Sequence, residues 1–144
     1  MAVKASSDAL EAAVRALSRR EHSTASLGER LARAGIPPSA RAEVIATLLN
    51  TGYLDDERFA LERARVRAAR GGSDAAIRHE LEAAGVEREL VEHALAELEP
   101  EQDRALRVAV RLGGGVRAAR ALARKGFAQD SIERALPGAV AELP

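Results

Sequence analysis

The chain of 144 residues contains no cysteine and no tryptophan, and only 2% of its residues are aromatic. Without cysteine it can form no disulfide, and it offers neither a thiolate metal ligand nor a cysteine nucleophile. The sequence has no apolar run of the length that a membrane span needs, and its first residues do not resemble a signal peptide. We therefore expect a cytoplasmic protein without membrane contact. So few aromatic rings also argue against a surface on which single-stranded bases stack.

The residue types that commonly carry catalysis or bind metals do not form a recognisable site. The three histidines are His22, His79 and His93, and His79-Glu80 begins like a zinc-protease helix but lacks the second histidine four residues later. The glycine-rich segment 113–115 has no Lys-Ser or Lys-Thr pair after it, as a phosphate-binding loop would. We therefore expect no enzymatic activity, no cofactor and no metal.

What the chain has in abundance is alanine, leucine, arginine and glutamate, which all favour helices. Apolar residues recur at helical spacing, as in Leu10, Val14 and Leu17, and each such stripe predicts an amphipathic helix with a buried face. Strand-like alternation of polar and apolar residues is missing over any useful length. The sequence predicts an all-α protein of about nine helices.

One pattern occurs three times, a leucine followed four residues later by a glycine and then by an apolar residue. The glycines are Gly35, Gly85 and Gly126, each placed where a residue with positive φ ends a helix. Each copy predicts a helix, a tight turn and a second helix, in the manner of a helix-turn-helix corner. We expect three tandem three-helix repeats, over residues 1–52, 53–98 and 99–144.

The charges balance over the whole chain, with a formal net charge of +0, but they are unevenly distributed. Residues 53–98 hold 7 basic and 11 acidic residues, whereas residues 1–52 hold 7 and 5 and residues 99–144 hold 8 and 6. Many arginines are spaced so that they share one side of a helix: Arg63, Arg67 and Arg70; Arg104, Arg107 and Arg111; Arg117, Arg120 and Arg124, with Lys125 beside the last. Such a set is either a solvated face or a contact surface for phosphates or an acidic protein. The contact is favoured over 104–125, where no acidic residue intervenes.

The segment Tyr-Leu-Asp-Asp-Glu-Arg-Phe-Ala at residues 53–60 stands between the first glycine turn and Arg70-Gly71. With the three glycine turns, this arrangement resembles the RecX family of recombinase regulators over most of the chain. The resemblance implies three tandem three-helix repeats in an elongated, curved molecule. It also implies binding in the groove of a RecA filament on single-stranded DNA, with inhibition of ATP hydrolysis and strand exchange as the expected effect.

Within this motif we expect Asp55 or Asp56 to cap a helix and Tyr53 and Phe59 to pack in the core. The arginine faces are the expected contact surface, and a monomer is the expected state. Two other interpretations remain open. One is a helix-turn-helix protein that binds DNA through its phosphates, and the other is a helical scaffold for an unrelated partner.

Overall fold

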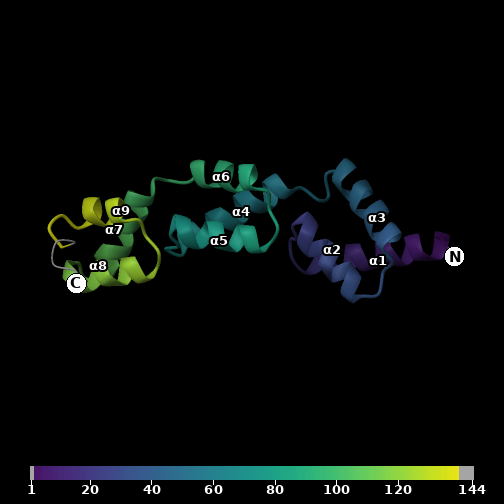
Figure 1. Ribbon diagram of the computed structural model, residues 1–144, viewed down its shortest axis with the longest axis horizontal. Helices are drawn as coiled ribbons and strands as arrows, with labels where there is room; N and C mark the ends of the chain where they lie inside the picture. The colour runs from purple at the N-terminus through teal and green to yellow at the C-terminus, as the bar shows by residue number, and fades with distance from the viewer. Residues whose placement is uncertain (1, 140–144) are drawn as a thin grey trace.

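The computed structural model describes residues 2–139, and this range is entirely helical, without a strand. Its helices are α1 (Ala2–Arg19), α2 (Thr24–Arg33), α3 (Pro38–Asn50), α4 (Asp56–Ala69), α5 (Asp74–Ala83), α6 (Arg88–Ala96), α7 (Glu101–Arg111), α8 (Gly115–Arg124) and α9 (Gln129–Ala135). Figure 1 shows them gathered in a row of groups, α1–α3, α4–α6 and α7–α9, with the first and last groups at opposite ends of the molecule. The predicted all-α fold of three three-helix repeats is confirmed. No helix within the described range is long and apolar enough to cross a bilayer.

We call the three groups the first unit (α1–α3), the second unit (α4–α6) and the third unit (α7–α9), and each has its own apolar core. The aliphatic side chains at the centres of these cores are fully buried: Leu27 and Leu31 in the first, Ile77 and Leu81 in the second, and Leu122 in the third. Much of the remaining core is alanine, which lets helices approach closely but buries little area per residue. We propose residues 1–52, 53–98 and 99–144 as the extents of the units.

The three glycine turns have the same geometry. Gly35, Gly85 and Gly126 have φ values of +83°, +78° and +91°. In each turn the amide of the next residue donates to the carbonyl of the repeated leucine, over 3.1 Å, and closes the end of the helix. That next residue, an isoleucine, a valine or a phenylalanine, is buried under the turn. The repeat that the sequence predicts therefore has one local structure in all three units.

The buried face of α1 differs from the predicted one. Leu10 and Val14 are 47% and 54% exposed, whereas Ala9, Ala13 and Ala16 are buried against α2 and α3. The same arrangement occurs in α4, where Ala60 and Ala64 are buried, and in α7, where Ala105 and Ala109 are buried. A pair of alanines four residues apart thus marks the core side of the first helix in every unit. Of the predicted stripe of α1, Leu10 and Val14 lie outside the core, and Leu17 is partly buried against it.

The first joint, where the first unit meets the second, is made by the beginning of α2. Ser23 caps α2 by accepting the amide of Ser26, and its hydroxyl donates across the joint to the carbonyl of Ala84 over 2.5 Å. The amide and the hydroxyl of Thr24 both donate to Asp56 Oδ1, over 2.7 and 2.9 Å. The amide at the beginning of α2, which has no partner within its own helix, is thereby hydrogen-bonded to a residue of the next unit.

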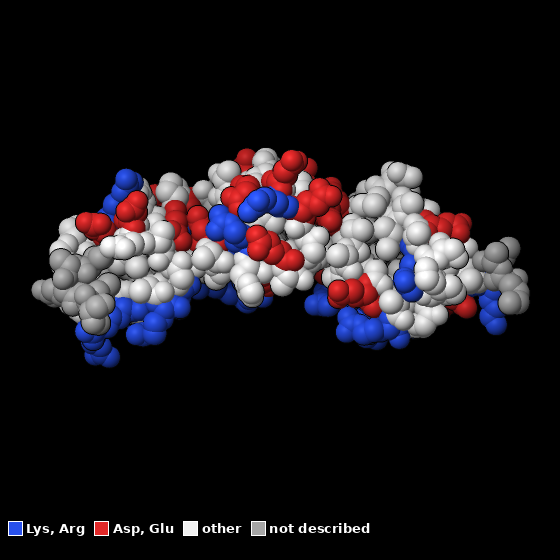
Figure 2. All heavy atoms as spheres, viewed as in Figure 1, with Lys and Arg blue, Asp and Glu red and all other residues white. Residues whose placement is uncertain are grey.

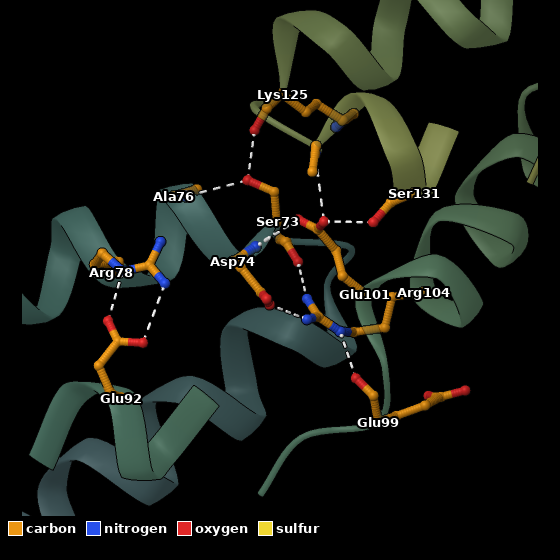
Figure 3. Close-up of polar contacts among 12 residues, drawn as sticks. Ser73, Asp74, Ala76, Arg78, Glu92, Glu99, Glu101, Arg104, Lys125 and Ser131 are labelled. Atoms are coloured by element: carbon orange, nitrogen blue, oxygen red, sulfur yellow. Dashed lines mark hydrogen bonds and ion pairs between the residues drawn. The ribbon is translucent and has the colours of Figure 1, made fainter. Parts of the chain in front are cut away.

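The second joint, between the second and third units, repeats this arrangement (Figure 3). Ser73 caps α5 and donates to the carbonyl of Lys125 over 2.8 Å, while the amide of Asp74 donates to Glu101 Oε1 over 3.0 Å. Glu101 also accepts the Ser131 hydroxyl, over 2.6 Å. Ser23 and Ser73 are both fully buried, so each hydroxyl is a fixed part of its joint.

Candidate partner-binding surface

The predicted contact residues on α8 lie on an open face of the third unit. Arg117, Arg120, Arg124 and Lys125 are all exposed, and none forms an ion pair with another described residue. They point outward because the other side of α8, with Leu122 among its residues, is buried in the core. We call these four residues the third-unit cluster.

The arginines of α4 are placed differently, because two of them bind a carboxylate within the second unit. Arg63 Nη1 lies 3.0 Å from Glu80 Oε1, and Arg67 holds the same carboxylate with two bonds of 2.7 and 2.9 Å. The hydrogen bond from Arg67 lowers the pKa of Glu80, and that from Arg63 lowers it further. Arg63 also lies over the Phe59 ring, 5.1 Å from its centre. Only Arg70 of this triple is exposed and has no ion pair to a described residue.

On α7 the prediction is wrong for Arg104, whose side chain is only 2% exposed. It belongs to the second joint, where it pairs with Asp74 and donates to the carbonyls of Gly72 and Glu99 over 2.7 and 3.1 Å (Figure 3). It therefore cannot form part of an outer contact surface. Arg107 is exposed but pairs with Glu99, with 2.7 Å between Nη1 and Oε1, and Arg111 is exposed at the end of the helix.

A second basic surface, on the first unit, was missed from the sequence. Arg19, Arg20, Arg30 and Arg33 line one cleft between the end of α1 and α2, and all four are exposed. None forms an ion pair with another described residue. Acidic residues at positions 21 and 29 interrupt these arginines in the sequence, but neither lines the cleft. We call the four arginines the first-unit cluster.

His22 lies at the base of this cleft and is 6% exposed. Its Nδ1 is 3.0 Å from the Ser26 hydroxyl, which itself donates to the carbonyl of Ser23. Because the hydroxyl hydrogen is used, Nδ1 is the donor in this contact. Burial lowers the pKa of His22, and the positive charges of Arg20 and Arg30 lower it further. The cleft is thus a region of positive potential around a neutral imidazole.

The two clusters belong to the same edge of the molecule. In Figure 2, Lys and Arg side chains gather along the lower edge, beneath α2 and α8 as Figure 1 places them, and this edge is hollowed between the two ends. Asp and Glu side chains are concentrated on the upper part of the second unit. We refer to the side that carries both clusters as the basic edge.

The motif at residues 53–60 has a structural role, with one correction. Asp55 is the cap of α4 and accepts the amide of Arg58 over 3.0 Å, whereas Asp56 reaches across the first joint. Phe59 is buried, as predicted. Tyr53 is 73% exposed, so the prediction that it packs in the core is wrong. Among the described residues, no three His, Asp or Glu side chains are grouped as a metal site would require.

Comparison with known proteins gives one family. Residues 9–48 match the model described as "RecX, first three-helix domain", and residues 55–95 match "RecX, second three-helix domain". The regulatory protein RecX of Halorhodospira halophila is 36% identical over 140 residues, which cover 90% of this chain and 86% of the relative. That of Stenotrophomonas maltophilia is 36% identical over 129 residues, covering 83% and 79%.

Two solved structures share the fold. The crystal structure of RecX from Lactobacillus salivarius superposes with a TM-score of 0.81 at 19% identity, over 92% of this chain and 95% of the other. A second structure, of regulatory protein RecX, gives a TM-score of 0.77 at 18% identity, over 92% and 71%. From the two domain models, the identity to curated relatives and the shared fold, the chain belongs to the RecX family of regulatory proteins, which are not enzymes.

Proposed function

We propose that this protein binds the RecA filament on single-stranded DNA and inhibits its ATP hydrolysis and strand exchange. Membership of the RecX family supports RecA as the partner. The observation on this chain that supports the proposal best is the basic edge, where the first-unit and third-unit clusters stand on the two outer units of an elongated body. The proposed partner also places the protein in the cytoplasm, where we propose that it acts as a monomer.

The clusters have the chemistry that an acidic or phosphate-bearing surface requires. A guanidinium group keeps its charge at every physiological pH and can bind a carboxylate or phosphate with two parallel hydrogen bonds. Arg67 and Arg107 use this capacity within the chain, on Glu80 and Glu99, and Arg63 adds a single bond to Glu80. The arginines of the two clusters have no described acidic partner, so they are available to another molecule.

Two clusters on one body also suggest how binding could regulate a filament. When the first cluster is bound, the second is held near the filament, and its binding becomes an intramolecular step. A protein that contacts two neighbouring subunits in this way favours whichever filament state fits both contacts. A difference of about 1 to 3 kcal/mol in the free energy of binding to two filament states is enough to shift the populations of these states severalfold.

The experiment is a titration of RecA ATPase activity on single-stranded DNA with the purified chain. We expect ATP hydrolysis to fall at amounts of the chain below those of RecA, because one bound molecule contacts more than one subunit. ATPase activity that is unchanged at a molar excess of the chain would remove the proposal.

A DNA-binding protein is the second candidate, because the same clusters could bind phosphates directly. Direct binding through six to ten phosphates weakens by about 10³ to 10⁵ between 50 and 200 mM salt, and it needs no RecA. Fluorescence anisotropy with duplex and single-stranded DNA alone distinguishes the two. Tight, steeply salt-dependent binding together with an unaffected ATPase would favour this second candidate.

A further inference from the structure

The first unit has a groove that corresponds to the two joints but is empty. It lies between α1 and the turn 34–37, and Ala5, Asp8, Ala12 and Gly35 are among its lining residues. In the second and third units, the equivalent place between the first helix and the glycine turn is filled by the beginning of a helix from the preceding unit. The groove therefore has the form of a site that binds the beginning of a helix, as the equivalent places in the other two units do.

The occupied joints show what such a site accepts. In both, the incoming helix begins with Ser-x-Ala: Ser23-Thr-Ala25 in the first joint and Ser73-Asp-Ala75 in the second. The serine hydroxyl donates to the carbonyl of the residue that ends the helix before the glycine turn, Ala84 or Lys125, and the alanine lies against that turn. A Cβ added to Gly85 would come within 2.4 Å of the Cβ of Ala25, and one added to Gly126 would lie 3.5 Å from that of Ala75.

In the first unit the same contact points are free. A Cβ on Gly35 would meet no atom of the described residues within 4 Å. In the occupied joints, a carboxylate, Asp56 or Glu101, accepts the amide at the beginning of the incoming helix. This acidic residue lies four residues before the first buried alanine of its own helix, and in α1 the same position is Ala5. Asp8 follows three residues later and supplies an exposed negative charge within the groove. The other charged residues that line it are Lys4, Glu11 and Arg15, of which the last two form an ion pair.

We propose that this groove binds a helix of a partner protein whose first turn reads Ser-x-Ala, with the serine hydroxyl on the end of α2 and the free amides toward Asp8. A second copy of this chain is a poor occupant. The serines of both its Ser-x-Ala helix starts are buried in its own joints, and α8, the corresponding helix of the third unit, begins after Gly114, which has no side chain to donate. The proposal does not depend on RecA being the partner.

The test is an NMR titration of the ¹⁵N-labelled full chain with an acetylated and amidated peptide that copies residues 22–34. We expect saturable shifts of the Ala34, Gly35 and Ile36 amides. Replacing the first of the peptide's two serines by glycine, the Ser23→Gly change, removes one hydrogen bond and should weaken binding about fivefold. Shifts centred on Gly85 or Gly126 would mean that the peptide opens an existing joint, and this would overturn the proposal.

Two variants of the chain make the test specific. Ala5→Asp restores the carboxylate that the occupied joints use, and we expect it to tighten peptide binding about tenfold, as a hydrogen bond to a charged acceptor would. Ala42→Asp on α3 makes the same charge change at an exposed position outside the groove, and it should leave the affinity unchanged. A gain cannot arise from misfolding, so equal affinities of the two variants would contradict the proposal. So would a dimer of the unliganded chain in sedimentation that Ala5→Arg abolishes, because the occupant would then be a second copy.

Discussion

Arg104 is a buried cation that links two units. It pairs with Asp74 and donates to two backbone carbonyls, so its charge is compensated from both sides of the second joint. Arg104→Met removes the cation and leaves Asp74 and both carbonyls without it. We expect a loss of about 2 to 4 kcal/mol in the free energy of unfolding, measured by urea denaturation.

The matched control is Arg111→Met, on the same helix at an exposed position. It should change the free energy of unfolding by less than about 0.5 kcal/mol. Equal stabilities of the two variants would show that the pair and its carbonyl contacts do not hold the joint.

His22 makes stability depend on pH near neutrality. Its pKa is lowered in the folded protein from the ordinary value of 6.5, so the unfolded chain takes up a proton first as the pH falls. The free energy of unfolding is therefore unaffected by His22 above this value and decreases as the pH drops toward the lowered pKa. We expect the melting temperature to decrease on acidification from about pH 7.5 to 5.5, and to decrease less in His22→Gln. The interpretation fails if the melting temperatures of the wild type and of His22→Gln decrease by the same amount.

At the residue level, the sequence predicts which side chains are charged but not which ones remain free. Arg104, Arg107 and Arg111 share a helical spacing, yet one is buried, one is paired and one is exposed. Their surroundings come from other units and from the segment before α7, which helical periodicity does not describe. Tyr53 was misplaced for a similar reason, because an aromatic residue beside a helix start packs only if another element covers it.

The serine caps are the elements that turn separate units into one body. Ser73 satisfies the start of α5 and a carbonyl at the end of α8 with a single hydroxyl. Ser73→Ala loses both bonds, and we expect it to destabilise the protein by about 2 kcal/mol. Ser73→Gly retains most of the capping energy and should lose about 1 kcal/mol, from the bond across the joint.

Urea denaturation of both variants, with Ser7→Ala as an exposed control, measures these losses. In hydrogen-exchange measurements, the Ser73 variants should show faster amide exchange in the turn that follows α8. If Ser73→Ala and Ser7→Ala have the same stability, the hydroxyl does not contribute to the joint.

The helices and turns could be predicted because their causes are local. Glycine ends the helices before Ile36, Val86 and Phe127 by its own conformational freedom, and serine or aspartate begins others by capping. The buried face of α1 could not, since Leu10 and Val14 form the more apolar stripe. The alanine face is the one that permits close helix contact, and this advantage appears only when the neighbouring helices are in place.

At the scale of the whole molecule, the geometry of the joints determines the relative positions of the charged residues of different units. The sequence shows basic residues in residues 1–52 and 99–144, but their placement on one hollowed edge follows from how the units are joined. The first-unit cluster shows this clearly. Its two pairs, Arg19 with Arg20 and Arg30 with Arg33, meet only because α1 and α2 lie side by side, and no spacing in the sequence brings one pair to the other.

The central claim is that the protein regulates RecA through both clusters of the basic edge. The measurement is the amount of protein that half-inhibits RecA ATPase on single-stranded DNA, for variants that each lose three exposed arginines. One variant is Arg19→Ala, Arg30→Ala and Arg33→Ala, and the other is Arg117→Ala, Arg120→Ala and Arg124→Ala. The control replaces Arg65, Arg88 and Arg134, which are exposed on other helices.

Exposed charge contacts contribute about 0.5 kcal/mol each, so we expect either cluster variant to need about tenfold more protein. The control should match the wild type. Circular dichroism checks that every variant keeps its helices. Half-inhibition by either cluster variant at the wild-type amount, or an equal loss in the control, would contradict the account.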